Sequence, residues 1–108
     1  MCELLGMSSR YPARLTSSLM SLAAHAGGTS RNSDGWGIAL YDERDVTLFR
    51  EAGRASESPL VQFLLAGGPS TTLALGHIRH ATQGSRTLAN TAPFARELAG
   101  RMHVFTHN

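Results

Sequence analysis

The sequence contains no lysine, few aromatic residues and a single cysteine. All ten basic residues are arginines, scattered singly from Arg10 to Arg101, and the net charge is only +2. A nucleic-acid-binding surface needs clustered positive charge, usually with aromatic side chains between the charges, and aromatic residues make up only 6% of this chain. We therefore expect no nucleic acid among its partners.

Long apolar runs are absent as well. None approaches the roughly 18 residues needed to cross a bilayer, so we expect no membrane partner. The chain starts with Met1, Cys2 and Glu3, and an acidic third residue is unlike a secretory signal. We therefore expect a cytoplasmic protein. A lone cysteine in that reducing compartment is either buried filler or a reactive thiol.

The chain length of 108 residues allows one domain. Its short elements, separated by glycine and proline, favour an α+β fold. Strands are predicted over residues 3–7, 36–41, 46–51, 73–79 and 103–107, and the acidic turn 42–45 joins two of them into a hairpin. The segment 81–101 lacks periodicity, and we expect a functional loop there.

Two helices are predicted from apolar spacing. The first carries Leu15, Leu19, Leu22 and Ala26 at helical intervals and ends at the glycine pair 27–28. The second begins with Ser58 as the N-cap and proline at the first helical position, and residues 67–69 end it. Its expected buried stripe is Leu60, Phe63 and Leu64.

The chain stops at a predicted strand end, without a closing helix. We expect residues 1–108 to be the N-terminal part of a truncated domain. Its continuation would complete the sheet and add a second helical cover.

Cys2 stands where removal of the initiator methionine would give it a free α-amino group. That group titrates near pH 7.7–8.0, so an appreciable fraction can accept the thiol proton at neutral pH. The nucleophile and its base would then share one residue, with no need for a histidine partner. Cys2 is therefore a candidate catalytic residue.

Three further groups of residues can carry chemistry. Arg79, at a predicted strand end, can hold a carboxylate through two parallel hydrogen bonds or simply form a surface ion pair. Asn90 and Asn108 can donate hydrogen bonds to an oxyanion or act as turn residues. Trp36 lies between two glycines and could be part of a substrate-binding site, an aromatic anchor of the core, or both.

Taken in order, the motifs resemble the class II glutamine amidotransferases, in particular a small stand-alone subfamily. They are Met-Cys-Glu-Leu-Leu-Gly at 1–6, Asp-Gly-Trp-Gly-Ile at 34–38, His-Ile-Arg at 77–79, Asn-Thr-Ala-Pro-Phe at 90–94 and His-Asn at 107–108. The resemblance implies an αββα four-layer sandwich of N-terminal-nucleophile hydrolases, present here as an N-terminal fragment. We expect no cofactor and no metal.

The resemblance also implies an activity, in which Cys2 attacks the side-chain amide of glutamine or of another γ-glutamyl compound and forms a thioester. Ammonia or an amine leaves, and water then frees glutamate. Arg79 would bind the substrate α-carboxylate, and Asn108 would be a catalytic oxyanion donor. The remaining substrate-binding residues would be His80, Thr82, Asn90 and Trp36.

This chain departs from the family pattern at two positions. Ala92 stands where members usually have histidine, and Gln83 stands where synthase-type relatives often have one. Both positions bear on how the loop over the substrate is fixed. Two questions stay open: whether ammonia passes to a synthase partner or is simply released, and whether the chain is a non-catalytic binding or structural member of the same fold.

A zinc site is an alternative to a catalytic cysteine site. The candidate ligands are His77, His80, His103, His107 and Cys2. Residues three apart on a strand face opposite sides, which separates His77 from His80, whereas His103 and His107 share a face. The spacing therefore argues against this alternative.

Overall fold

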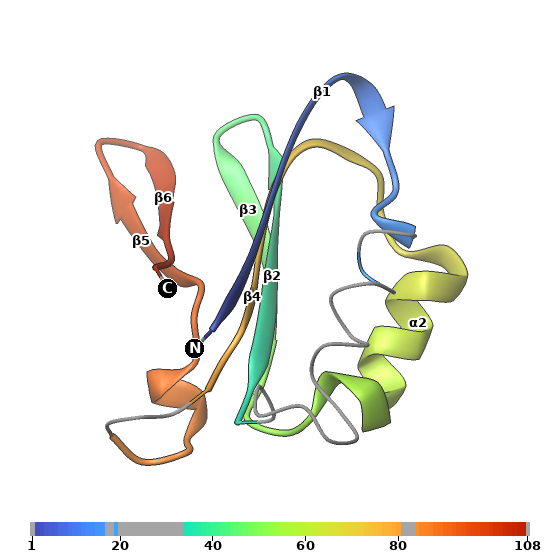
Figure 1. The fold of residues 1–108 in the computed structure, drawn as a ribbon. Coiled ribbons are helices and arrows are strands. Elements are labelled where there is room, and N and C mark those ends of the chain that lie inside the picture. Colours follow the sequence, from blue (N-terminus) through green and yellow to red (C-terminus); the bar gives the residue numbers. More distant parts are fainter. Residues whose placement is uncertain (1, 17–18, 20–33, 81–83, 108) are drawn as a thin grey trace.

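A four-stranded antiparallel sheet forms the centre of the molecule (Figure 1). The computed structural model describes residues 2–16, 19, 34–80 and 84–107, so most of the helix predicted over residues 15–26 lies outside the described part. The elements are β1 (Glu3–Ala13), β2 (Trp36–Asp42), β3 (Asp45–Glu51), the 3-10 helix η1 (Ala55–Glu57), α2 (Pro59–Gly67), β4 (Thr71–Ile78), the 3-10 helix η2 (Leu88–Asn90), β5 (Phe94–Leu98) and β6 (Arg101–Phe105).

The sheet has the strand order β1-β4-β2-β3, with every neighbouring pair antiparallel. The predicted hairpin is confirmed: β2 and β3 pair from Trp36 opposite Glu51 to Asp42 opposite Asp45. Glu43 in the turn has a φ of 56°. β1 continues well beyond the predicted residue 7, and it pairs with β4 starting from Glu3 opposite Ile78.

The predicted helix after Ser58 is confirmed, and its predicted buried stripe is right at Leu64 but wrong at Phe63. The Ser58 hydroxyl accepts a hydrogen bond from the Val61 amide at 3.2 Å, as an N-cap does. Val61 is 0% and Leu64 7% exposed, whereas Phe63 is 62% exposed. Residues 60–65 are apolar except for Gln62, so the sequence spacing could not tell which stripe would face the sheet.

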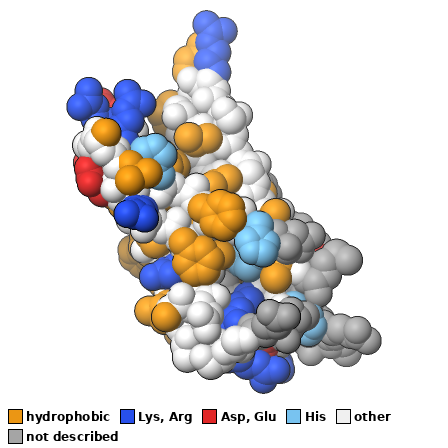
Figure 2. Space-filling model, turned by 90° about the vertical axis from the view of Figure 1, so that its left-hand side faces the viewer, with side chains coloured by type: hydrophobic (Ala, Val, Ile, Leu, Met, Phe, Trp, Pro, Cys, Tyr) orange, Lys and Arg blue, Asp and Glu red, His pale blue; other side chains and the backbone are white. Residues whose placement is uncertain are grey.

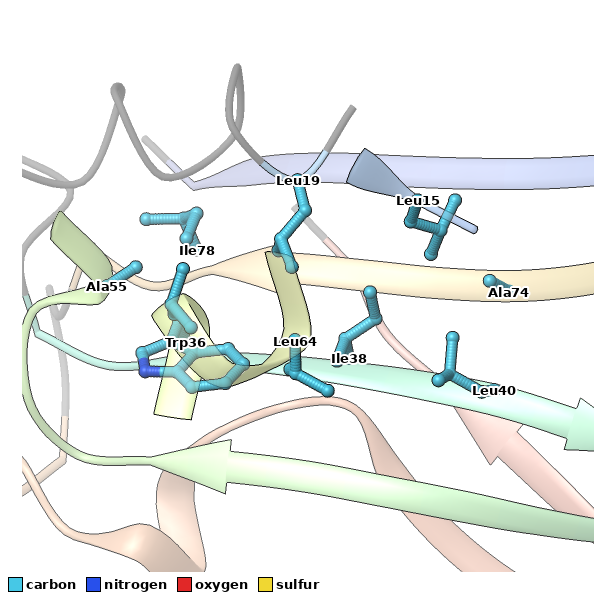
Figure 3. Packing of buried hydrophobic residues seen from close by; sticks show 10 residues of the cluster. Leu15, Leu19, Trp36, Ile38, Leu40, Ala55, Leu64, Ala74 and Ile78 are labelled. Carbon is cyan, nitrogen blue, oxygen red and sulfur yellow. The ribbon is translucent and has the colours of Figure 1, made fainter. Parts of the chain in front are cut away.

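The main core lies between the sheet and α2 (Figure 3). Trp36, Ile38 and Leu40 alternate along β2 and point to this face, where they meet Leu64. The other members of the buried cluster are Leu15, Leu19, Ala55, Val61, Ala74 and Ile78. Alternation along β2 therefore decides which residues fill the core.

The Trp36 side chain also fixes the entrance to α2. Its indole Nε1 donates a hydrogen bond to Glu51 Oε1 at 2.9 Å, and the Ser58 hydroxyl donates to the same carboxylate oxygen. The carboxylate of Glu51, the last residue of β3, thus binds both the core tryptophan and the N-cap residue of α2. A buried indole N–H needs such a partner.

The opposite side of the sheet faces a hairpin formed by β5 and β6 (Figure 1). This hairpin corrects the prediction that 81–101 is a loop, and β6 begins and ends two residues earlier than the strand predicted over 103–107. All five residues of β5 are exposed, so its sequence lacks the buried alternation that identifies a strand. The Met102 amide donates to the Arg44 carbonyl at 2.8 Å, which attaches the hairpin to the turn between β2 and β3.

Hydrophobic side chains lie exposed on the β5–β6 side, and histidines lie among them (Figure 2). Phe94 and Phe105 are 39% and 59% exposed, and the Phe105 ring lies 5.7 Å from the His107 ring. The described residues confirm the α+β class. None of the helices that they form is long and apolar enough to span a membrane.

Candidate active site

Cys2 lies at the end of the central sheet, against the residue that follows Arg79. The amide of His80 donates a hydrogen bond to Cys2 Sγ at 3.3 Å, and the thiol lies 3.8 Å from the His80 carbonyl oxygen. The antiparallel register of β1 and β4 causes this contact, because it places Glu3 opposite Ile78. The half-buried thiol therefore contacts the residue directly after the His-Ile-Arg motif, 78 positions away in the sequence.

Arg79 is buried although it carries a charge, with only 7% of its surface exposed. Its amide donates to the Gly35 carbonyl at 2.8 Å, which extends the pairing of β2 and β4 by one step. Its Nη1 donates to the Ser85 carbonyl at 2.9 Å. The guanidinium is thus oriented by the loop 84–90, close to the strand end that holds Cys2.

Asp34 joins three segments of the site. It is 5% exposed, and its amide donates to the Arg79 carbonyl at 3.1 Å. Its carboxylate lies 2.8 Å from Arg86 Nε and 3.7 Å from His80 Nδ1. In the sequence, Asp34 stands out only as part of the Asp-Gly-Trp-Gly-Ile motif, and Arg86 belongs to no motif.

Asn90 turns its side-chain amide toward the same loop. Its Nδ2 lies 3.0 Å from the Ser85 carbonyl oxygen and 3.3 Å from the Ser85 hydroxyl. Arg79 and Asn90, two of the proposed substrate-binding residues, therefore both donate to the Ser85 carbonyl. Gly84, with a φ of 79°, lies beside both side chains: a Cβ there would be 3.2 Å from Asn90 Nδ2 and 3.6 Å from Arg79 Nη2.

The structure places Trp36 apart from these residues. Its ring is 1% exposed and packs in the core on the α2 side of the sheet (Figure 3). This position supports the core-anchor interpretation. Thr82 and Asn108 lie outside the described residues, so Cys2, Arg79, His80 and Asn90 are the candidates that the structure places near this strand end.

His77 is buried on β4, two residues before Arg79. It is 3% exposed, and among the described residues its Nδ1 has no hydrogen-bond partner. Burial lowers the pKa of His77 from 6.5, and the charges of His107 and Arg79 lower it further, against a hydrogen bond with the His107 backbone that raises it. The imidazole therefore favours the neutral form.

The segment 91–93 contains Ala92, at the position where family members usually carry histidine, and it is tightly packed. Thr91, Ala92 and Pro93 are buried, and the Thr91 carbonyl accepts a hydrogen bond from Arg50 Nη1 at 2.9 Å. A Cβ on Gly37 would overlap the Ala92 carbonyl oxygen. Close packing on Gly37 and the contact to Arg50 thus hold this segment with alanine in place.

The described part of the chain offers no gathering of three or more histidine, cysteine, aspartate or glutamate side chains that could hold a metal ion. His103 instead turns its Nδ1 toward the Arg101 carbonyl, 3.2 Å away. The zinc alternative thus finds no support in this geometry.

Comparison with known proteins gives a consistent result. A family model for class-II glutamine amidotransferases matches residues 1–108. The chain is 37% identical over 108 residues to YafJ of Escherichia coli strain K12, which is named as a glutamine amidotransferase, and covers 42% of that protein. A Haemophilus influenzae protein with the same kind of name is 40% identical over 108 residues, and the chain covers 37% of it. This chain is matched over its whole length in both cases.

A solved structure shares the fold. The crystal structure of a predicted glutamine amidotransferase from Pseudomonas aeruginosa PA01 aligns with a TM-score of 0.58 and 34% sequence identity, over 99% of this chain and 42% of that one. The glutamine–fructose-6-phosphate aminotransferase of Mycobacterium bovis is 36% identical over 112 aligned residues, but the chain covers only 16% of it. The chain therefore spans well under half the length of these relatives.

Proposed function

Because the chain belongs to the class II glutamine amidotransferases, we propose that it carries the nucleophile of an enzyme that cleaves the side-chain amide of glutamine or of another γ-glutamyl compound. Cys2 is the proposed nucleophile. A cytoplasmic location is part of the proposal, because an unpaired reactive thiol suits a reducing compartment.

One observation carries the proposal. The thiol of Cys2 lies against the backbone of His80, directly after Arg79. The proposed nucleophile and the proposed carboxylate-binding arginine are thus at one end of one sheet. A glutamine bound by Arg79 through its α-carboxylate would have its side chain free to extend toward the thiol.

The proposed chemistry requires removal of Met1. The α-amino group of Cys2 then accepts the thiol proton, and Sγ forms a bond to the amide carbon. The carbon–nitrogen bond breaks, the nitrogen takes the proton, and ammonia or an amine leaves. Water adds to the thioester in the same way, which frees glutamate and restores the thiol.

The other proposed residues act on binding and on charge. Arg79 would bind the α-carboxylate, with His80, Thr82 and Asn90 around the substrate, and a fixed guanidinium suits this task because it can donate two parallel hydrogen bonds. Asn108 would donate to the oxyanion of the tetrahedral intermediate, and losing one such donor costs about 2.7–4 kcal/mol in a comparable hydrolase. Since Trp36 is enclosed in the core, its proposed contribution is to position the β2 end.

The proposal includes the four-layer αββα sandwich. The described sheet has α2 on one side, while Leu4 and Leu73 are 46% and 42% exposed. Both alternate with core-facing neighbours on their strands, so they belong to the opposite side of the sheet. A second sheet and a second helical layer would cover that side in the whole protein.

The fate of the ammonia separates two versions of the proposal. The Mycobacterium bovis relative, by its name, transfers an amino group to fructose 6-phosphate. A chain of this kind with a synthase partner would pass ammonia on, and without one it would act as a γ-glutamyl hydrolase. Ammonia release without any acceptor favours the second version.

The test is intact-mass spectrometry of the whole protein before and after exposure to 6-diazo-5-oxo-norleucine, a glutamine analogue that alkylates nucleophiles. We expect a mass without Met1 that gains one label on Cys2. A Cys2→Ala variant is the matched control and should gain none. Retained Met1 without labelling would instead support the non-catalytic member of the fold.

A further inference from the structure

We propose that Arg86 is a positioning residue of the glutamine site and acts through Asp34 and Ser85. This inference rests on the proposed function. Arg86 itself lies outside the site motifs of the chain, and its side chain is 70% exposed. An arginine so exposed has little reason to be fixed unless its partner holds it.

The partner is a buried carboxylate. Asp34 has only 6% of its side chain exposed, and its Oδ1 lies 2.8 Å from Arg86 Nε. A carboxylate removed from water is stable only when it is paired, so this contact is worth more than an ordinary surface ion pair. The pairing therefore holds the start of the loop 84–90 against the turn that precedes β2.

The same loop orients Arg79. Ser85, next to Arg86, presents its carbonyl oxygen to Arg79 Nη1 at 2.9 Å and to Asn90 Nδ2 at 3.0 Å. If Ser85 moved, Arg79 and Asn90 would lose a shared acceptor. The ion pair of Arg86 with Asp34 thus controls the direction of the guanidinium that would bind the substrate carboxylate.

Asp34 also reaches the nucleophile through the backbone. Its amide donates to the Arg79 carbonyl at 3.1 Å, and its Oδ2 lies 3.7 Å from the ring of His80, whose amide contacts Cys2 Sγ. The ion pair of Arg86 is with the Asp34 carboxylate, whereas the contact of Cys2 Sγ is with the His80 backbone. Loss of Arg86 should therefore impair glutamine recognition more than thiol reactivity.

The experiment compares two alkylation rates at Cys2 in the whole protein. One reagent, 6-diazo-5-oxo-norleucine, must be recognised as glutamine, and the other, iodoacetamide, needs only the thiol. We expect Arg86→Gln to slow labelling by the glutamine analogue about tenfold, as for a misplaced positioning group. Labelling by iodoacetamide should stay within about twofold, and Arg86→Lys should recover part of the lost rate because it keeps the charge.

Two further variants make the test specific. Arg54→Gln breaks a pair with Glu57, 3.9 Å apart in the segment that follows β3, and should change neither rate. The double variant Asp34→Asn/Arg86→Gln should label no more slowly than Asp34→Asn, because both changes remove the same contact. In steady-state assays, Arg86→Gln should raise KM for glutamine about tenfold and change kcat less than about threefold.

The outcomes separate this inference from the proposed function. A wild-type protein that reacts with iodoacetamide but ignores the glutamine analogue overturns the proposed function, and the role of Arg86 with it. If the wild-type protein reacts with both reagents and Arg86→Gln reacts with each at the wild-type rate, only the role of Arg86 is overturned. Equal slowing of both reagents also overturns it, because the change would then act on the thiol.

Discussion

The two faces of the central sheet differ in the side chains that they bury. The face under α2 is filled by Trp36, Ile38 and other apolar side chains in a continuous cluster. The opposite face carries the buried His77 and receives the tight segment 91–93. Burial of apolar side chains on the first face stabilises the fold. On the second face some of the buried groups are polar, and burying them costs free energy. Stability and chemistry can therefore be perturbed separately.

The clearest separation is expected for Cys2→Ala. All release of ammonia from glutamine should be lost, because no other residue would take over the covalent step. The free energy of unfolding should change by no more than about 0.5 kcal/mol, since the thiol is only half buried. Ammonia assays and chemical denaturation check the two parts. Substantial turnover in the variant would rule out Cys2 as the nucleophile.

The α2 face should be broken by Trp36→Ala. This change removes a fully buried ring and its hydrogen bond to Glu51, and it should lower the free energy of unfolding by about 3–5 kcal/mol. Phe63→Ala is the matched control, because that ring is 62% exposed, and it should cost less than about 0.5 kcal/mol. Urea denaturation compares them. Equal losses would contradict the assignment of the core.

The opposite face should be disturbed by Gly37→Ala. The added Cβ would overlap the Ala92 carbonyl oxygen and crowd Pro93, so the segment 91–93 must move, at an expected cost of about 1–3 kcal/mol. Gly6→Ala is the control, because nothing lies within 4 Å of a Cβ built there. Thermal denaturation would show the difference. A Gly37→Ala protein as stable as the control would mean that the close approach is not maintained.

The smallest expected effect concerns protons on His77. Its folded-state pKa is lowered below 6.5, so the unfolded chain binds the proton more readily. The stability present above pH 6.5 is therefore lost as the pH falls from 6.5 through the folded-state pKa, with a slope below about 1.4 kcal/mol per pH unit. His77→Gln should flatten this dependence in urea titrations across that range. Identical curves for the wild-type and His77→Gln proteins would contradict the prediction.

The sequence predicted the elements whose signals are local. The β2–β3 hairpin and the helix capped by Ser58 were found because turn residues, an N-cap and proline act within a few positions. The stripe of α2 was assigned wrongly at Phe63, since a helix apolar on most sides does not reveal which side meets the sheet. β5 was missed because all its residues are exposed.

The site was predictable only in its motifs. Cys2 and Arg79 were named from their positions in the chain, and the structure brings them to one strand end. The ion pair of Asp34 with Arg86 could not be predicted, because it joins an exposed arginine to a carboxylate 52 positions away by the numbering of the chain. Such contacts depend on the packing of three segments, which single-residue patterns do not encode.

The start of β1 has a practical consequence. Hydrogen bonding between the strands begins at Glu3, the residue directly after Cys2. Cys2, the proposed nucleophile, therefore lies directly beside the paired part of the sheet. An affinity tag joined to this end would block the α-amino group that the proposed reaction uses. The tag would also begin one residue before the paired strand, close to the proposed site. Purified protein for any assay should therefore carry its tag elsewhere or be cut to leave cysteine first.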